Sequence, residues 1–294
     1  MEKPVTDWIY TEGCKIPEGQ QLPSGVSRYA AIVQYQGADF CGFQRQKHSP
    51  SVQQEIETAL SYVANCPVII HCAGRTDSAV HASHQVIHFD TAAERSGYSW
   101  VQGANSQLPN SIALIWADKI TQDFHSRFSA GARTYRYVID NSPTRPAIMS
   151  SAVTWVKKPL DISLMQESCE YLLGEQDFSA FRGSGCQSNS PYRNVHQAKV
   201  FRRGNLVIFE ITANAFLLHM VRNIVGSLLE VGVARQQSQW IQALLAQGDR
   251  CKSAATAAPD GLYLVAVNYP ATFGLPMLAK GPVFLPATLN NTEE

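Results

Sequence analysis

The sequence has little charge and no net charge. Only 16% of its 294 residues are Asp, Glu, Lys or Arg, and 24 basic side chains balance 24 acidic ones. It has no run of eighteen apolar residues, which argues against a membrane-spanning helix. The first ten residues, MEKPVTDWIY, lack the basic start and apolar centre of a signal peptide. We therefore expect a soluble, cytoplasmic protein with no membrane partner.

Cysteine is also sparse. The chain has seven cysteines, an odd number, and no two of them form a Cys-x-x-Cys pair. This pattern indicates neither a disulfide framework nor a zinc site built from thiolates. We expect mostly structural, reduced thiols and no metal.

The charge that is present is unevenly distributed. Residues 111–160 carry seven Lys or Arg against three acids, and residues 181–235 carry seven against two, whereas residues 161–180 hold five acids and no base. A neutral protein can present a basic face to a polyanion in this way. Solvated faces with no special purpose explain the charges equally well at this point.

Hydrophobic periodicity predicts an α+β fold. Hydrophobic residues make up 45% of the chain and can form one large core or two moderate ones. Strands are predicted at 28–36, 67–73, 84–91 and 112–120, and helices at 51–63, capped by Ser51, and near 97–106. The second half is predicted to repeat this order, with strand 133–140, helix 161–173 capped by Asp161, hairpin 195–213, helix 215–231, a short helix and strand 261–268. We predict two successive β-α-β-β-α-β (ferredoxin-like) units, whose antiparallel sheets form a central cleft.

The predicted division of the chain follows from these elements. Residues 28–125 would form an N-terminal α+β domain and residues 126–270 a C-terminal one. Residues 1–27 and 271–294 would be tails that are mobile or lie on the surface, because they are rich in Pro or polar residues without periodicity.

Two charged positions interrupt apolar surroundings. The stretch CAGRTDSAVHA, residues 72–82, places Arg75 and Asp77 on the connection between two predicted strands. Arg222 lies in the middle of the apolar 215–231 helix, where an unpaired charge would cost several kcal/mol. Its partner could be Asp77, Glu210 or Glu230. If it is Asp77, the carboxylate stays ionised in a partly dry site and can act as a nucleophile or base.

Aromatic and arginine side chains alternate just after the first half. They suit stacking on unpaired bases together with phosphate binding. An amphipathic strand with a wet tyrosine edge is the competing interpretation. These residues are Phe124, His125, Arg127, Phe128, Arg133, Tyr135, Tyr137 and Arg145.

Six blocks in order resemble the tRNA pseudouridine synthase A family, over about residues 28–286. The most specific is Gly74-Arg-Thr-Asp-Ser-Ala-Val-His81, in which Asp77 stands where the family has its catalytic aspartate. The other five blocks are Gly42-Phe-Gln-Arg-Gln46, Arg133-Thr-Tyr-Arg-Tyr137, Cys186-Gln-Ser-Asn-Ser-Pro-Tyr-Arg193, Asn214 to Gly226 and Gly261-Leu-Tyr-Leu-Val265.

The resemblance implies conversion of uridine to pseudouridine at nucleotides 38, 39 and 40 of the tRNA anticodon arm, by a homodimer that uses no cofactor. It implies that Asp77 is the essential carboxylate, that Tyr135 packs on the target uracil and that Arg222 pairs with Asp77. Arg75 would help to hold the space left by the flipped-out nucleotide. Segments 124–128 and 185–189, including Gln187 and Ser188, would contact RNA in the central cleft. Whether Asp77 attacks the substrate or removes a sugar proton stays open.

Two departures and two rival interpretations remain. Ala79 replaces the family's usual glycine, and His84 stands where small residues are common, which predicts a slightly remodelled loop. His81, His84 and His88 could belong to a metal hydrolase, but a strand does not place this spacing on one face. Alternatively, the protein could bind RNA without catalysis and would then tolerate loss of Asp77.

Overall fold

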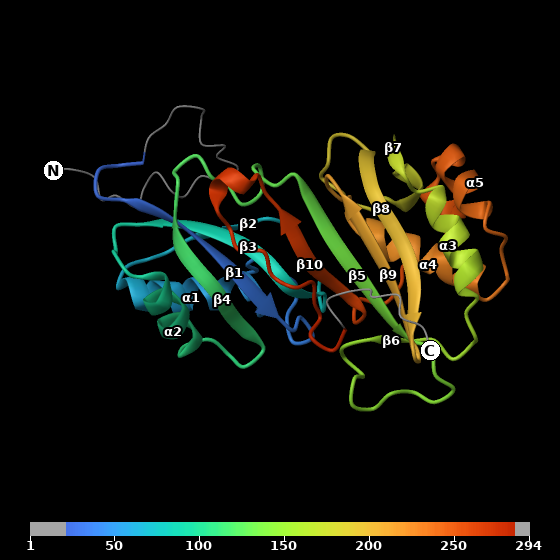
Figure 1. Cartoon of the computed structure of the whole chain (residues 1–294), viewed down its shortest axis with the longest axis horizontal. Coiled ribbons are helices and arrows are strands. Elements are labelled where there is room, and N and C mark those ends of the chain that lie inside the picture. Colours follow the sequence, from blue (N-terminus) through green and yellow to red (C-terminus); the bar gives the residue numbers. More distant parts are fainter. Residues whose placement is uncertain (1–21, 286–294) are drawn as a thin grey trace.

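The computed structural model describes residues 22–285, and its first half has the predicted order of elements. The sheet strands of this half lie beside one another, with both helices packed on one face (Figure 1). The elements are β1 (Ser27–Tyr35), α1 (Val52–Ala64), β2 (Ile70–Cys72), β3 (His81–Thr91), α2 (Gly97–Asn105) and β4 (Ile112–Ile120).

The second half has the predicted strands and helices and two additional short strands. Neither addition shows a hydrophobic alternation: β7 reads Gly-Glu-Gln-Asp, and β6 has only two residues. The elements are β5 (Ala132–Asp140), β6 (Thr154–Trp155), α3 (Ile162–Glu170), β7 (Gly174–Asp177), β8 (Tyr192–Arg203), β9 (Leu206–Ala213), α4 (Met220–Gly232), α5 (Trp240–Gln247), β10 (Leu262–Asn268) and the 3-10 turns Ser179–Phe181, Arg250–Lys252 and Ala271–Phe273.

All strands belong to one mixed sheet, where separate antiparallel sheets were predicted. The order is β4-β1-β3-β10-β5-β9-β8-β7, with β2 beside β3 and β6 beside β5. The two halves meet where β10 pairs in parallel with β3, through Tyr263 opposite His81 and Leu264 opposite Ala82. The other edge of β10 pairs antiparallel with β5. The last strand therefore joins the halves into a continuous, mostly antiparallel sheet.

The core lies mainly between the sheet and the helices. Figure 1 shows α1 and α2 near one end of the sheet and α3, α4 and α5 near the other. The larger cluster of buried side chains includes residues from these helices together with Tyr137 of β5. Its strand neighbour Val138 belongs to a second, smaller cluster with Tyr263 and Leu285. Because neighbouring residues of a strand point to opposite faces, this second cluster covers the other face.

The C-terminal segment contacts the sheet in its described part. In its described part, up to residue 285, Leu285 is buried, and the carbonyls of Lys280 and Gly281 accept hydrogen bonds from Arg136 at 3.1 and 2.8 Å. These contacts pack the segment on the sheet. Most of the predicted N-terminal tail, residues 1–21, lies outside the described residues, as do residues 286–294.

The two predicted helix caps have different outcomes. Asp161 accepts hydrogen bonds from the Ser163 and Leu164 amides at 2.9 and 3.1 Å, which confirms it as the cap of α3. Ser51 occupies the cap position of α1 but makes no side-chain capping bond.

The helix predicted at 215–231 begins five residues later than expected. His219 has left-handed backbone angles, φ 58° and ψ 4°, and immediately precedes α4. The chain therefore enters the helix through a turn, which an apolar periodicity does not reveal. No helix within residues 22–285 is long and apolar enough to cross a membrane.

Candidate active site

The connection from β2 to β3 is tied to the rest of the sheet on both sides of Asp77. The carbonyl of Thr76 accepts a hydrogen bond from the Phe43 amide at 3.0 Å. The Thr76 hydroxyl lies 2.8 Å from the Tyr35 hydroxyl. The Ala79 amide donates to the carbonyl of Phe40 at 3.2 Å. Buried or backbone partners therefore fix the turn, so the Asp77 side chain starts from a defined position.

Gly42 belongs to one of the six blocks and lies close to this turn in the folded chain. Its φ is 102°, a region that strongly favours glycine. A Cβ atom at this position would lie 3.0 Å from the Thr76 carbonyl oxygen and 3.3 Å from the Asp77 carbonyl carbon. The backbone at Gly42 thus supports the Asp77 turn by close approach.

Asp77 is flanked by two basic side chains. Arg222 Nη1 and His219 Nε2 each lie 3.6 Å from Asp77 Oδ2. The exposed fractions of the Asp77, Arg222 and His219 side chains are 26%, 15% and 36%, so the group is partly accessible to solvent. Arg222 is held in place because its Nε donates to the Ala257 carbonyl at 2.8 Å.

The alternative partners of Arg222 are engaged elsewhere. Glu210 is fully buried and accepts a hydrogen bond from Arg136 Nε at 2.7 Å. Glu230 lies 2.9 Å from Arg235 Nη1. Of the three carboxylates considered from the sequence, only Asp77 lies within ion-pair distance of Arg222 in the described part of the chain.

Tyr135 projects from β5 toward the same turn. A Cβ atom on Gly74 would lie 3.6 Å from the Tyr135 hydroxyl, and the Tyr135 ring packs edge-on against Phe216 at 5.0 Å between centroids. Burial raises the pKa of Tyr135, and the charge of Asp77 raises it further. The phenol therefore keeps its proton and can donate a hydrogen bond near the Asp77 turn.

The segment 124–128 divides into a buried part and an exposed part. Phe124, predicted to contact RNA, is fully buried against Tyr269 and Phe273, so its ring is not available. The prediction for the Phe124 ring was wrong because core aromatics and stacking aromatics look alike in sequence. Phe128 and Arg127 are exposed, with the guanidinium 5.6 Å from the centre of the ring.

His125 lies between these two parts. Its ring is 4.4 Å from Phe128 and 4.5 Å from His88 between centroids, and its Nδ1 accepts hydrogen bonds from the Arg127 and Phe128 amides. Burial, followed by the neighbouring His71 and Arg28, lowers the pKa of His125 to about 4. At neutral pH the ring is therefore an uncharged aromatic surface.

Arg133 connects this segment to the Asp77 turn. Its guanidinium donates to the carbonyls of Ala73 at 3.1 Å and Arg127 at 2.6 Å, and to those of Ala130 and Asn214 at 3.1 and 2.9 Å. These four bonds use the side chain to hold loops together. The predicted contact of Arg133 with RNA must therefore compete with them.

The other predicted RNA contacts lie on loops. Arg75 is exposed two residues before Asp77, and Arg145 is exposed between β5 and β6. Gln187 is exposed, whereas Ser188 is half-buried and accepts a hydrogen bond from Arg193 at 2.6 Å.

The three histidines of the rival metal site have different surroundings. His81 Nδ1 accepts from the Gly37 amide at 3.0 Å, and its Nε2 lies 3.0 Å from the Asp260 carbonyl oxygen. Both ring nitrogens are thus used within the protein. His84 is buried with no partner for its Nδ1, and burial lowers its pKa. Within residues 22–285, no three His, Cys, Asp or Glu side chains are grouped as ligands for a metal ion.

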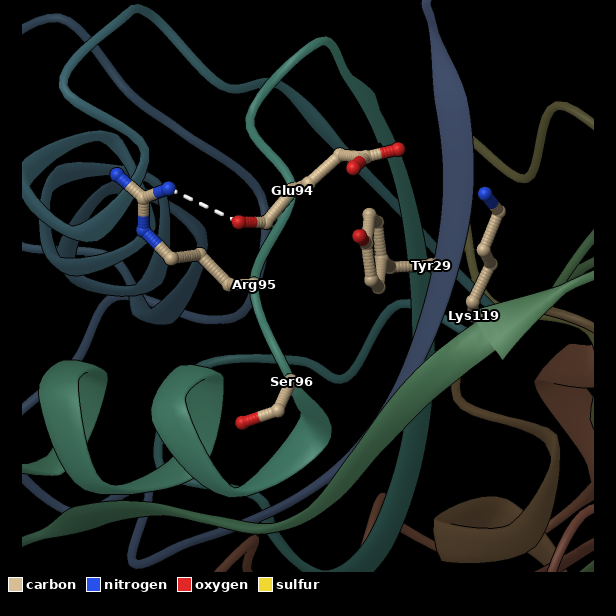
Figure 2. A pocket seen from close by; sticks show the side chains of 5 residues that line it. All are labelled: Tyr29, Glu94, Arg95, Ser96 and Lys119. Carbon is tan, nitrogen blue, oxygen red and sulfur yellow. Dashed lines mark hydrogen bonds between the residues drawn. The ribbon is translucent and has the colours of Figure 1, made fainter.

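A surface hollow lies in the first half of the molecule, on β1 and β4. Figure 2 shows its lining, in which Arg95 reaches outward and donates to the Glu94 carbonyl. The hollow measures about 360 Å³ and has no member of the Asp77 group among its lining residues Tyr29, Glu94, Arg95, Ser96 and Lys119. It offers mixed charges but no nucleophile with an activating neighbour.

The Asp77 group has the composition of an enzyme's reaction centre. It combines a carboxylate, a permanent cation, an imidazole that can exchange protons and a phenol that keeps its proton. It also draws on both halves, since Asp77 lies between β2 and β3 while Tyr135 and Arg222 come from β5 and α4.

Comparison with known proteins identifies the family. A family model described as tRNA pseudouridine synthase matches residues 31–129 and 168–270, which include Asp77 and Arg222 but not Tyr135. The tRNA pseudouridine synthase A of Vibrio cholerae is 53% identical over 263 residues, covering 90% of this chain and 100% of that protein. That of Pasteurella multocida is 54% identical over 258 residues, covering 88% and 98%. The chain belongs to the tRNA pseudouridine synthase family, whose members are isomerases.

The comparison with solved structures gives a much weaker match. A chain from the structure titled "Crystal Structure of a Cbf5-Nop10-Gar1 Complex" has a TM-score of 0.34 and 12% identity, covering 81% of this chain and 49% of that chain. This likeness supports no conclusion here.

His219 is the member of the site that the sequence did not predict. It lies within the Asn214–Gly226 block, three residues before Arg222, a spacing that places two side chains on one face of a helix. In the folded chain, however, His219 precedes α4, and a left-handed turn brings it to Asp77.

Proposed function

We propose that this protein isomerises uridine to pseudouridine at nucleotides 38, 39 and 40 in the anticodon stem-loop of tRNA. The observation that carries the proposal is Asp77 on a fixed turn, with Arg222 and His219 each 3.6 Å from its Oδ2. The reaction breaks the bond from N1 of uracil to C1′ of ribose and forms one from C5 to C1′. It requires no external oxidant or reductant.

Asp77 is the essential carboxylate in this proposal. It either attacks the substrate or removes a sugar proton, and both routes need its ionised form. Arg222 stabilises that form, since it keeps its charge at all working pH values. Tyr135 provides a ring against which the target uracil packs and a hydroxyl that retains its proton.

The target nucleotide must leave its stack before it can reach Asp77, at a cost of roughly a few kcal/mol. Arg75 is exposed beside Asp77 and is proposed to occupy the vacated space. Exposed Arg127 and Phe128 are proposed to supply a cation and a ring for RNA binding, and Arg145, Gln187 and Ser188 to extend the contact with RNA. His125 supports Phe128 from beneath.

The proposed assembly is a cytoplasmic homodimer in which each tRNA contacts both subunits. Residues 28–125 and 126–270 are proposed as two ferredoxin-like domains that share the continuous sheet. The order β4-β1-β3, with β2 on β3, supports this for the first half. The order β10-β5-β9-β8 supports it for the second.

The test is a map of pseudouridine positions after incubation of the purified protein with unmodified tRNA. Asp77→Asn should abolish the product while tRNA affinity falls by less than about tenfold, because the change is nearly isosteric. The exposed Asp118→Asn is the matched control and should keep full activity. Activity of Asp77→Asn within tenfold of wild type would refute the role of Asp77, and a wild-type protein that binds tRNA without turnover would favour the pure binding function.

A further inference from the structure

His219 has a left-handed backbone conformation that few non-glycine residues adopt. Its left-handed backbone costs about 1 kcal/mol or more, yet it is held at the start of α4. The His219 carbonyl accepts the Asn223 amide at 2.9 Å, and the Gly183 amide donates to the preceding carbonyl, that of Leu218, at 2.7 Å. These bonds fix the backbone on both sides of the imidazole.

Close packing also restricts the side chain. A Cβ atom on Gly183 would lie 3.0 Å from His219 Nδ1 and 3.2 Å from His219 Cβ. The ring is therefore backed by the Gly183 turn, while its Nε2 lies on the side of Asp77. A strained residue whose imidazole is aimed at the reactive carboxylate is a candidate for a chemical role.

The proposed isomerisation leaves one proton to account for. When C5 of the rotated uracil bonds to C1′, it still carries its hydrogen, and the C5–H bond must break for the ring to recover its conjugation. The electron pair of that bond returns to the ring, and N1 takes up a proton. A base near Asp77 must therefore accept the C5 proton.

Few groups at the site can act as this base. Arg222 has no acceptor, and the Tyr135 phenol keeps its proton in this environment. Asp77 has its own role earlier in the reaction, as the nucleophile or as the base that takes the sugar proton. His219 remains, and a neutral imidazole has one ring nitrogen that can accept a proton.

We propose that His219 Nε2 is the general base that accepts the C5 proton, an assignment that rests on the function proposed above. The resulting imidazolium lies 3.6 Å from the Asp77 carboxylate, which stabilises it. The Arg222 guanidinium, 3.6 Å from the same oxygen, disfavours a long-lived positive charge on the His219 ring. The proton is therefore held briefly and passed to solvent, from which N1 is protonated.

The experiment compares single-turnover rates on tRNA containing protium or deuterium at C5 of uridine. His219→Asn removes the base but retains a residue that tolerates left-handed angles. We expect the rate to fall by about 10²-fold or more, and the isotope effect of C5 deuterium to increase over that of wild type. His196→Asn, on the exposed surface of β8, is the matched control and should behave as wild type.

A second variant separates chemistry from structure. His219→Gly also tolerates the backbone angles and leaves room for added imidazole, which should restore part of the rate. A rate within threefold of wild type for His219→Asn would overturn the assignment. So would a large loss with an unchanged isotope effect and no rescue, which would mean that His219 only positions the site. If wild type releases no C5 hydrogen from tRNA, the proposed function itself fails.

Discussion

The ion pair between Asp77 and Arg222 allows a quantitative test of how the site is built. At 3.6 Å the Coulomb attraction is about 1 kcal/mol in a water-like dielectric and about 5 kcal/mol at an effective dielectric constant of about 20. The side chains are 26% and 15% exposed, so the pair lies between these limits. Desolvation and side-chain ordering reduce the net value, and we expect a coupling free energy of about 1 to 2 kcal/mol.

The assay is a double-mutant cycle measured by urea unfolding of wild type, Asp77→Ala, Arg222→Met and the double variant. Arg222→Met also removes the bond to the Ala257 carbonyl, so its own cost exceeds the coupling. The cycle subtracts that contribution, because it appears in both variants that carry the substitution. The double variant should regain part of the stability lost by Asp77→Ala but no activity.

Two other ion pairs calibrate the result. The exposed pair Arg235–Glu230 should couple by less than about 1 kcal/mol. Arg28 and Asp90 are joined by two bonds of 2.7 Å and are nearly buried, so removing one partner should cost about 3 to 5 kcal/mol. A coupling below about 0.5 kcal/mol for Asp77 and Arg222 would refute the inference that they interact, and Arg222 would then serve the RNA alone.

Three further predictions concern the loop, the histidines and the RNA face. Ala79 has a φ of 61°, so Ala79→Gly should remove about 1 to 2 kcal/mol of backbone strain. The entropic cost of glycine is about 0.5 to 1 kcal/mol, so the free energy of unfolding should rise by about 0.5 to 1 kcal/mol. A loss of stability in urea would contradict this. The pKa of His88 is lowered well below 6.5, mainly by burial and further by Arg28, His71 and His125. As the pH falls through 6.5, the unfolded chain therefore binds one more proton than the folded chain. Stability should then drop by about 1.4 kcal/mol per pH unit from this residue, and an unchanged slope in His88→Asn would count against it. Arg127→Gln and Arg145→Gln should each flatten the salt dependence of tRNA binding by about one unit of slope, whereas Arg95→Gln in the hollow of Figure 2 should leave it unchanged; equal slopes in all three would exclude the proposed face.

Local pattern predicted most of the strands and helices because alternation and apolar periodicity are recorded in neighbouring residues. Strand 112–120 and the hairpin 195–213 match β4 and the pair β8 and β9 closely. The pairing of β3 with β10 could not be predicted in this way, since it joins residues about 180 positions apart through two registered pairs. The polar strand β7 was missed because its pairing with β8, rather than a buried face, holds it in place.

The site was predictable where a physical conflict was visible in the sequence. A permanent charge in an apolar helix requires a partner, which left Asp77, Glu210 and Glu230 as candidates for Arg222, and the family resemblance then favoured Asp77. Phe124 shows the opposite case, since nothing in the sequence distinguishes its buried ring from the exposed Phe128. His219 depends on a backbone turn imposed by Gly183 from another segment, so its direction is a property of the folded chain.

The segment immediately before β10 explains why the site needs both halves. The carbonyl of Ala257 accepts Arg222 Nε at 2.8 Å, that of Ala258 accepts the Tyr137 hydroxyl at 2.7 Å, and that of Asp260 lies 3.0 Å from His81 Nε2. These donors belong to α4, β5 and β3, the elements that carry or adjoin Arg222, Tyr135 and Asp77. Because β10 also inserts between β3 and β5, its pairing sets the spacing of the reactive groups. The position of the last strand therefore determines the geometry of the candidate site as well as the fold.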